Sequence, residues 1–60
     1  MADQLLMVRQ VAERLACSEW KVWDMIHKGE LRSIKVGRLE RIDPRDVEAF
    51  IGRNRRVVEL

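Results

Sequence analysis

The sequence predicts a small, mainly helical domain that contains three helices and one β-hairpin. Apolar residues recur at helical spacing in three segments, and a glycine divides two short strand-like runs between the second and third segments. Sixty residues suffice for one domain, which buries only about 60% of its unfolded surface. We expect this domain at residues 1–52, followed by a basic and apolar tail at 53–60.

The first two helices are predicted to follow one another almost without a break. Apolar positions at i, i+3, i+4 and i+7 mark one face of a helix at about 8–16: Val8, Val11, Ala12 and Leu15. Ser18 is a typical N-cap, and Gly29 follows a typical helix C-terminus, so the second helix is expected at about 18–28. The one or two residues between the helices require a steep crossing.

The segment RSIKVGRLERI predicts two strands joined by a glycine turn, and two registers are open. A two-residue turn places Lys35 opposite Glu40. A three-residue loop places Lys35 opposite Arg41, with Arg38 at the tip. We favour the loop because it gathers three apolar residues on one half-buried face: Ile34, Val36 and Ile42.

The segment DPRDVEAFI predicts the start of the third helix. Asp43 is the expected cap, Pro44 takes the first helical position, and Asp46 lies three residues after the cap. The apolar stripe of this helix is formed by Val47, Phe50 and Ile51. Gly52 either ends the helix or merely weakens it.

The net charge of +2 hides an uneven distribution. Residues 1–30 carry four bases and five acids, whereas residues 31–60 carry eight bases and five acids. The bases of the second half cluster in two groups: Arg32, Lys35, Arg38 and Arg41, then Arg53, Arg55 and Arg56. Arginine predominates, and its planar fork matches phosphates and guanine edges. A nucleic-acid partner is therefore weighed against a merely solvated basic face.

Several classes of protein are disfavoured. A single cysteine, Cys17, excludes an internal disulfide and leaves too few ligands for a structural zinc site, and we expect it to be a small buried side chain. No apolar run approaches the roughly 20 residues of a membrane span, and no signal-peptide pattern opens the chain. We expect a cytoplasmic protein without metal, cofactor or catalytic residues.

The order of helix, tight turn, helix, hairpin and helix resembles a winged helix-turn-helix DNA-binding domain. With Ala12 as the small residue of the motif, the expected apolar offsets fall on five residues: Val11, Leu15, Cys17, Val22 and Met25. Ala16 occupies the turn position where glycine is usual, and a left-handed alanine there costs on the order of 1 kcal/mol.

Residues 5–51 resemble the excisionase family, which is related to MerR-type regulators and includes small proteins of actinobacterial phages. The shared features are VAERL at 11–15, the Ser18 cap, GEL at 29–31, VGR at 36–38, and Ile42 followed by DVEAF at 46–50. Glu40 departs from the aromatic residue of many relatives. The resemblance implies a recombination directionality factor that binds adjacent sites near a phage attachment site, bends the DNA and promotes excision by an integrase.

Seven residues are expected to contact duplex DNA: Ser18, Glu19, Trp20, Lys21, Lys35, Arg38 and Arg41. Trp20 lies roughly 200° from Val22 around the second helix, and would pack against sugars or a thymine methyl, or else fold over the tail or a second copy. Arg38 would enter the minor groove. Trp23, at the edge of the apolar stripe, is expected in the core, and His27 on the surface.

Two other functions are weighed against the excisionase reading. A small transcriptional repressor would use the same fold, and a protein-interaction module would use the basic tail. Exposed apolar groups on different parts of the domain favour a head-to-tail contact between neighbouring copies on DNA: Trp20, Leu39, Val57, Val58 and Leu60.

Overall fold

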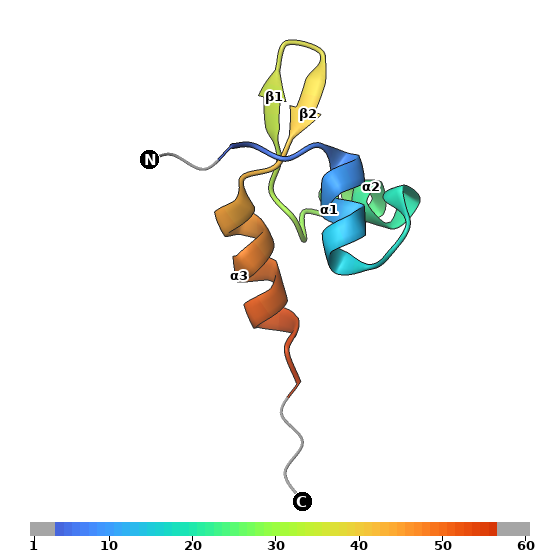
Figure 1. The fold of residues 1–60 in the computed structure, drawn as a ribbon, viewed down its shortest axis with the longest axis vertical. Coiled ribbons are helices and arrows are strands. Elements are labelled where there is room, and N and C mark those ends of the chain that lie inside the picture. Colours follow the sequence, from blue (N-terminus) through green and yellow to red (C-terminus); the bar gives the residue numbers. More distant parts are fainter. Residues whose placement is uncertain (1–3, 57–60) are drawn as a thin grey trace, which may run out of the picture.

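Three helices and a two-stranded hairpin make up the computed structural model, which describes residues 4–56 (Figure 1). The elements in chain order are α1 (Val8–Leu15), α2 (Glu19–His27), β1 (Ile34–Val36), β2 (Leu39–Arg41) and α3 (Pro44–Asn54). The strands are antiparallel, and the hairpin of residues 34–41 is called the wing below. The predicted fold class, mainly helical with a small hairpin, is confirmed.

The tight turn between α1 and α2 is built as the sequence predicts. Ala16 adopts the left-handed conformation with φ 56° and ψ 47°, which lets the chain reverse directly after α1. The backbone N–H of Cys17 donates to the carbonyl of Ala12 over 2.9 Å. The hydroxyl oxygen of Ser18 then accepts a hydrogen bond from the backbone N–H of Lys21 over 3.1 Å, and so caps α2.

The core is formed by eight buried apolar residues from all three helices and the segments between them: Val8, Val11, Ala12, Val22, Met25, Leu31, Ile42 and Val47. Among the described residues no polar or charged residue is buried. Cys17 is only partly buried against this core, so the expectation of a buried thiol holds in part.

Ile42 connects the core to both the wing and the incoming chain. Its side chain is fully buried, and its backbone forms an isolated antiparallel bridge with Leu6. The two hydrogen bonds of the bridge measure 2.7 and 2.9 Å. The N-terminal segment therefore crosses the base of the wing before α1 begins (Figure 1).

The favoured hairpin register is wrong, and the alternative register is observed. Lys35 lies opposite Glu40 and Val36 opposite Leu39, so that residues 37 and 38 form a two-residue turn. Gly37 has φ 63°, and the described non-glycine residues include only Ala16 with positive φ. A positive φ at the first turn residue alone is the pattern of a type II′ turn.

The wing lacks the half-buried face on which the favoured register depends. Ile42 lies below the wing in the core, whereas Ile34 and Val36 are 39% and 47% exposed. Burial therefore does not fix the register, and the turn and the Lys35–Glu40 ion pair of 3.6 Å agree with the shorter connection. Lys35 and Arg41 consequently lie on opposite faces of the wing, not on the shared face that was predicted.

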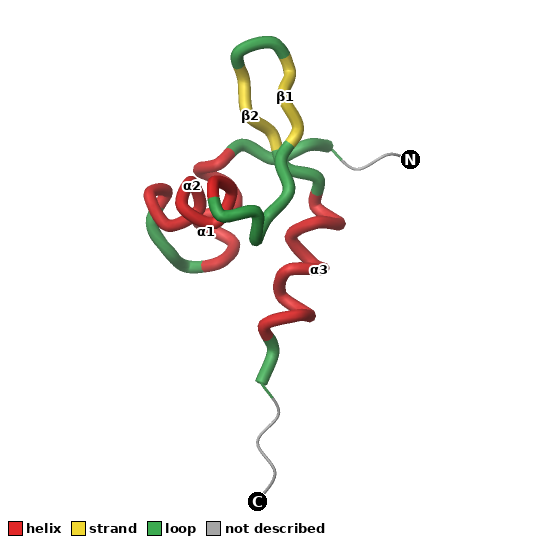
Figure 2. Tube along the Cα trace, turned by 180° about the vertical axis from the view of Figure 1, so that it is seen from behind, coloured by secondary structure: helices red, strands yellow, loops and turns green. Residues whose placement is uncertain are grey.

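The segment 28–33 lies between α3 on one side and α1 and α2 on the other (Figure 2). Helix α3 begins as predicted, with Asp43 as its cap and Pro44 in its first turn, and it continues through Gly52 to Asn54. Arg14 of α1 forms an ion pair of 2.6 Å with Glu48 of α3. The predicted tail lies partly outside the described residues, which end at residue 56.

Substituting Asp43 with asparagine tests how the carboxylate at the N-cap of α3 contributes to the pH dependence of stability. The side chain of Arg45, and then its backbone N–H, donate hydrogen bonds to Asp43 and lower the pKa of this carboxyl below its ordinary value of 3.8. A lowered pKa adds stability above the unfolded pKa of about 3.9, and that stability is lost as the pH falls through the folded pKa. Asparagine keeps the cap but cannot titrate.

The wild-type protein should therefore lose more free energy of unfolding than Asp43→Asn when the pH falls from about 5 to about 2.5. Urea unfolding of both proteins at each pH measures the difference. Equal losses would show that Asp43 contributes nothing to the acid sensitivity.

Candidate nucleic-acid interface

The outer face of α2 begins with three exposed residues of its first turn. Glu19, Trp20 and Lys21 all lie exposed, and the Trp20 side chain retains 72% of its accessible surface. The opposite face buries Val22 and Met25 in the core. The predicted outward position of Trp20 is confirmed, and Ser18 positions this turn through its cap rather than through a side chain directed outward.

The second tryptophan is not a core residue, and this prediction is wrong. Trp23 is 38% exposed and stacks on His27, with ring centroids 6.3 Å apart and planes inclined by 29°. The cause is helix geometry, because Trp23 lies about 100° from Val22, at the margin of the buried stripe. A small core filled by Val22 and Met25 leaves the indole partly outside, so both tryptophans present surface to solvent.

The far end of α2 carries a local ion pair. Asp24 and Lys28 lie one turn apart, and their charged atoms are separated by 3.1 Å. The hydrogen bond to Asp24, and the attraction between the two charges, raise the pKa of Lys28 above its ordinary value. The cation of Lys28 is thus already paired, whereas Lys21 at the start of the helix forms no ion pair with any described residue.

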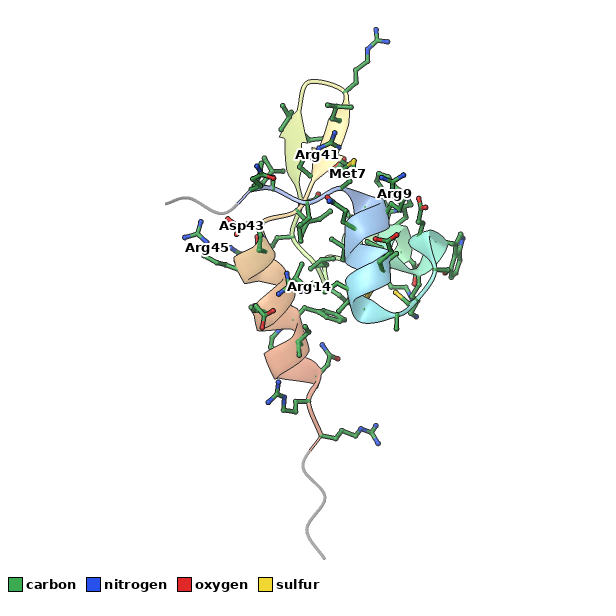
Figure 3. The ribbon with its side chains drawn as sticks, in the orientation of Figure 1. Met7, Arg9, Arg14, Arg41, Asp43 and Arg45 are labelled. Carbon is green, nitrogen blue, oxygen red and sulfur yellow. The ribbon has the colours of Figure 1, made fainter. Side chains whose placement is uncertain are left out.

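A groove of about 430 Å³ lies between α2 and the wing, with the start of α1 between them. Nine residues line this α2–wing groove: Met7, Val8, Arg9, Glu19, Trp23, Arg38, Leu39, Glu40 and Arg41. Figure 3 shows Met7 between Arg41 at the base of the wing and Arg9 at the start of α1. The groove brings together Glu19, Arg38 and Arg41 of the predicted set.

The wing distributes its three cations unequally. One guanidinium nitrogen of Arg41 donates to the carbonyl of Glu40 over 2.8 Å, which holds this side chain at the groove. Arg38 occupies the turn and forms no hydrogen bond or ion pair with another described residue. Lys35 lies on the other face, 3.6 Å from the Glu40 carboxylate. Glu40 also accepts a hydrogen bond of 2.6 Å from the Ser33 hydroxyl.

Arg9 and Trp23 line the groove but are not among the residues predicted to contact DNA. A sequence signal for Arg9 exists, because a cation in the first turn of a helix opposes the helix dipole and α1 has no acid there. An unfavourable charge in this position suggests a role other than stability. For Trp23 only the tertiary structure supplies the signal, since its sequence position is compatible with the core.

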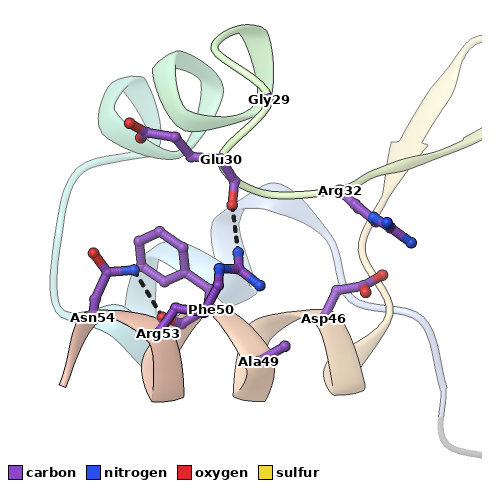
Figure 4. Close-up of a pocket in the computed structure, with 8 residues that line it drawn as sticks. All are labelled: Gly29, Glu30, Arg32, Asp46, Ala49, Phe50, Arg53 and Asn54. Carbon is purple, nitrogen blue, oxygen red and sulfur yellow. Dashed lines mark hydrogen bonds between the residues drawn. The ribbon is translucent and has the colours of Figure 1, made fainter.

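A second hollow, of about 590 Å³, lies between the segment after α2 and the helix α3 (Figure 4). Its charged lining side chains balance: Arg32 and Arg53 face Glu30 and Asp46. Arg53 donates to the carbonyl of Glu30 over 2.9 Å, which ties α3 to the segment after α2. This hollow therefore lacks the positive excess that a polyanion requires.

Within residues 4–56, no group of three His, Cys, Asp or Glu residues is placed to hold a metal ion. No helix in the same range is long and apolar enough to cross a membrane.

The fold and the exposed α2 surface define a helix-turn-helix domain, and comparison with known families agrees. A model of the helix-turn-helix domain family matches residues 5–55, so the chain belongs to this family. The family includes excisionase-like DNA-binding proteins and is typically non-enzymatic, and it implies DNA as the partner. Neither the curated proteins nor the solved structures gave a significant match.

Substituting the two tryptophans separately tests the assignment of α2 surfaces. Trp20→Ala should leave the melting temperature nearly unchanged, because the exposed indole contributes little to the core. It should weaken binding to duplex DNA, because Trp20 lies on the outer face of α2. Trp23→Ala should lower the free energy of unfolding by less than the roughly 3–5 kcal/mol expected for a fully buried tryptophan. It should also weaken DNA binding. Thermal melts and fluorescence titrations measure both effects. Unfolding of Trp20→Ala alone would overturn the phasing of α2.

Proposed function

We propose that this protein is an architectural DNA-binding factor of the excisionase type, a recombination directionality factor. It binds cooperatively near a phage attachment site, bends the DNA and promotes prophage excision by an integrase. The observation that carries the proposal is the run of motifs at 11–15, 18, 29–31, 36–38 and 42–50, which fall on α1, the N-cap of α2, the segment after α2, the wing and the first part of α3. The proposed activity is binding without cleavage.

The proposed DNA contacts divide by element. Helix α2 enters the major groove with Trp20 and Lys21 foremost, and Glu19 accepts from a cytosine amino group. Arg38 at the wing turn enters the adjacent minor groove, supported by its exposed position without a protein partner. Arg41 contacts phosphate. Lys35 remains a proposed phosphate contact from the outer face of the wing, where it is 71% exposed beside Glu40.

Cooperative assembly on DNA is supported by where apolar surface is exposed. Val36 on the wing is 47% exposed and Leu5 before α1 is 39% exposed, and neither is assigned to a DNA contact. Phe50 and Ile51 of α3 instead pack against the core. Distinct apolar patches favour a heterologous, head-to-tail contact, which does not close into a two-fold dimer. One module offers only about 600–1,000 Å² of interface, so neighbouring copies would add useful affinity.

The salt dependence of binding tests the DNA partner itself. Four to six phosphate contacts per copy should give a log–log slope of roughly −4 to −5 per monomer, since each contact releases about 0.9 counterion. Fluorescence anisotropy with a labelled duplex at several salt concentrations measures the slope. A slope near zero would reject nucleic acid as the partner.

The arrangement of sites tests architecture against simple repression. Footprinting on the attachment region should reveal direct repeats, and a circular-permutation gel assay should show a bend that grows as the repeats fill. The physical reason is that each head-to-tail contact adds the same rotation between copies. A stable two-fold dimer that binds one palindrome without bending would instead support a small winged-helix transcriptional regulator.

A further inference from the structure

We propose that the α2–wing groove holds one sugar–phosphate strand of duplex DNA, with Arg9 and Arg41 on a phosphate and Trp23 and Leu39 against deoxyribose. The inference rests on the proposed DNA binding and adds a contact from the start of α1 to those proposed for α2 and the wing. Its ligand is the phosphodiester backbone, whatever the base sequence.

The position of the groove points to the backbone. The major and minor grooves of duplex DNA are separated by one sugar–phosphate strand. A domain that places α2 in one groove and the wing in the next must let this strand pass between them. The α2–wing groove lies at that passage, bounded by Trp23 on α2 and by Leu39 and Arg41 on β2.

The chemistry of the lining matches a sugar–phosphate chain. Trp23 and Leu39, 38% and 50% exposed, provide apolar surface for the deoxyribose carbons. The carboxylate of Glu40 is engaged with Ser33 and Lys35, at 2.6 and 3.6 Å, on the other face of the wing. Among the described residues, the lining carries three arginines and two carboxylates, Glu19 and Glu40, so it has the positive excess that phosphates require: Arg9, Arg38 and Arg41.

Arg9 and Arg14 give a natural comparison on one helix. Arg9 lies in the groove and forms no hydrogen bond or ion pair with another described residue. Arg14 lies five residues later and is paired with Glu48 of α3 at 2.6 Å. Both arginines are exposed to water, so replacing either one changes stability little. Their charges are equal, and only their surroundings differ.

The experiment compares Arg9→Gln, Arg9→Lys and Arg14→Gln in the full chain on a random-sequence duplex of about 20 base pairs, because phosphate contacts are independent of sequence. Arg9→Gln should reduce the magnitude of the log–log salt slope by about 0.9 and weaken binding several-fold. Arg9→Lys should retain the wild-type slope, because the charge is kept. Arg14→Gln should also retain it, and thermal melts verify that each variant is folded.

Neutral methylphosphonates, placed one at a time in a second duplex whose selected binding site fixes a single register, locate the contact. One position should weaken wild-type binding but leave Arg9→Gln binding unchanged. Equal slope changes for Arg9→Gln and Arg14→Gln would show that Arg9 acts only through the net charge of the protein. This result would overturn the inference. A wild-type slope near zero would instead remove the proposed DNA binding itself, so the two failures are distinguishable.

Discussion

The buried position of Ile42 is the constraint on which the remainder of the structure depends. Its side chain is fully enclosed, and its backbone exchanges two hydrogen bonds with Leu6. One residue thereby fixes the end of β2, the start of α3 and the path of the chain into α1. Because the wing has no buried face of its own, this anchor at its base determines how it stands relative to α2, and hence the width of the α2–wing groove.

The helices are held around this anchor by few contacts. Val11, Val22 and Val47 are fully buried and bring α1, α2 and α3 to a common core. At the surface, Arg14 reaches Glu48 and Arg53 reaches the carbonyl of Glu30, so α3 is tied to both other parts of the fold. Such exposed polar contacts contribute little stability each, and they serve mainly to set the orientation of α3.

Pairing within the protein also shapes the distribution of charge at the surface. Several charged side chains already have partners within the protein, including Lys28 with Asp24 and Lys35 with Glu40. The cations left without an ion pair among residues 4–56 include Arg9, Lys21 and Arg38, which lie on the start of α1, the start of α2 and the wing turn. Folding thus pairs some of the cations with acids and leaves others available at the surface, although the net charge is only +2.

The sequence by itself determined the three helices, the N-caps Ser18 and Asp43 and the tight turn at Ala16, because these depend on local spacing and on backbone preferences of single residues. It also placed Trp20 outward, since helix phase is a local property. The hairpin register, the exposure of Trp23 and the presence of Arg9 in the groove were decided by the tertiary structure alone. Each depends on how much space the core leaves and on which distant segments meet. Leu6, for example, forms the bridge to Ile42, and the wing remains exposed to solvent.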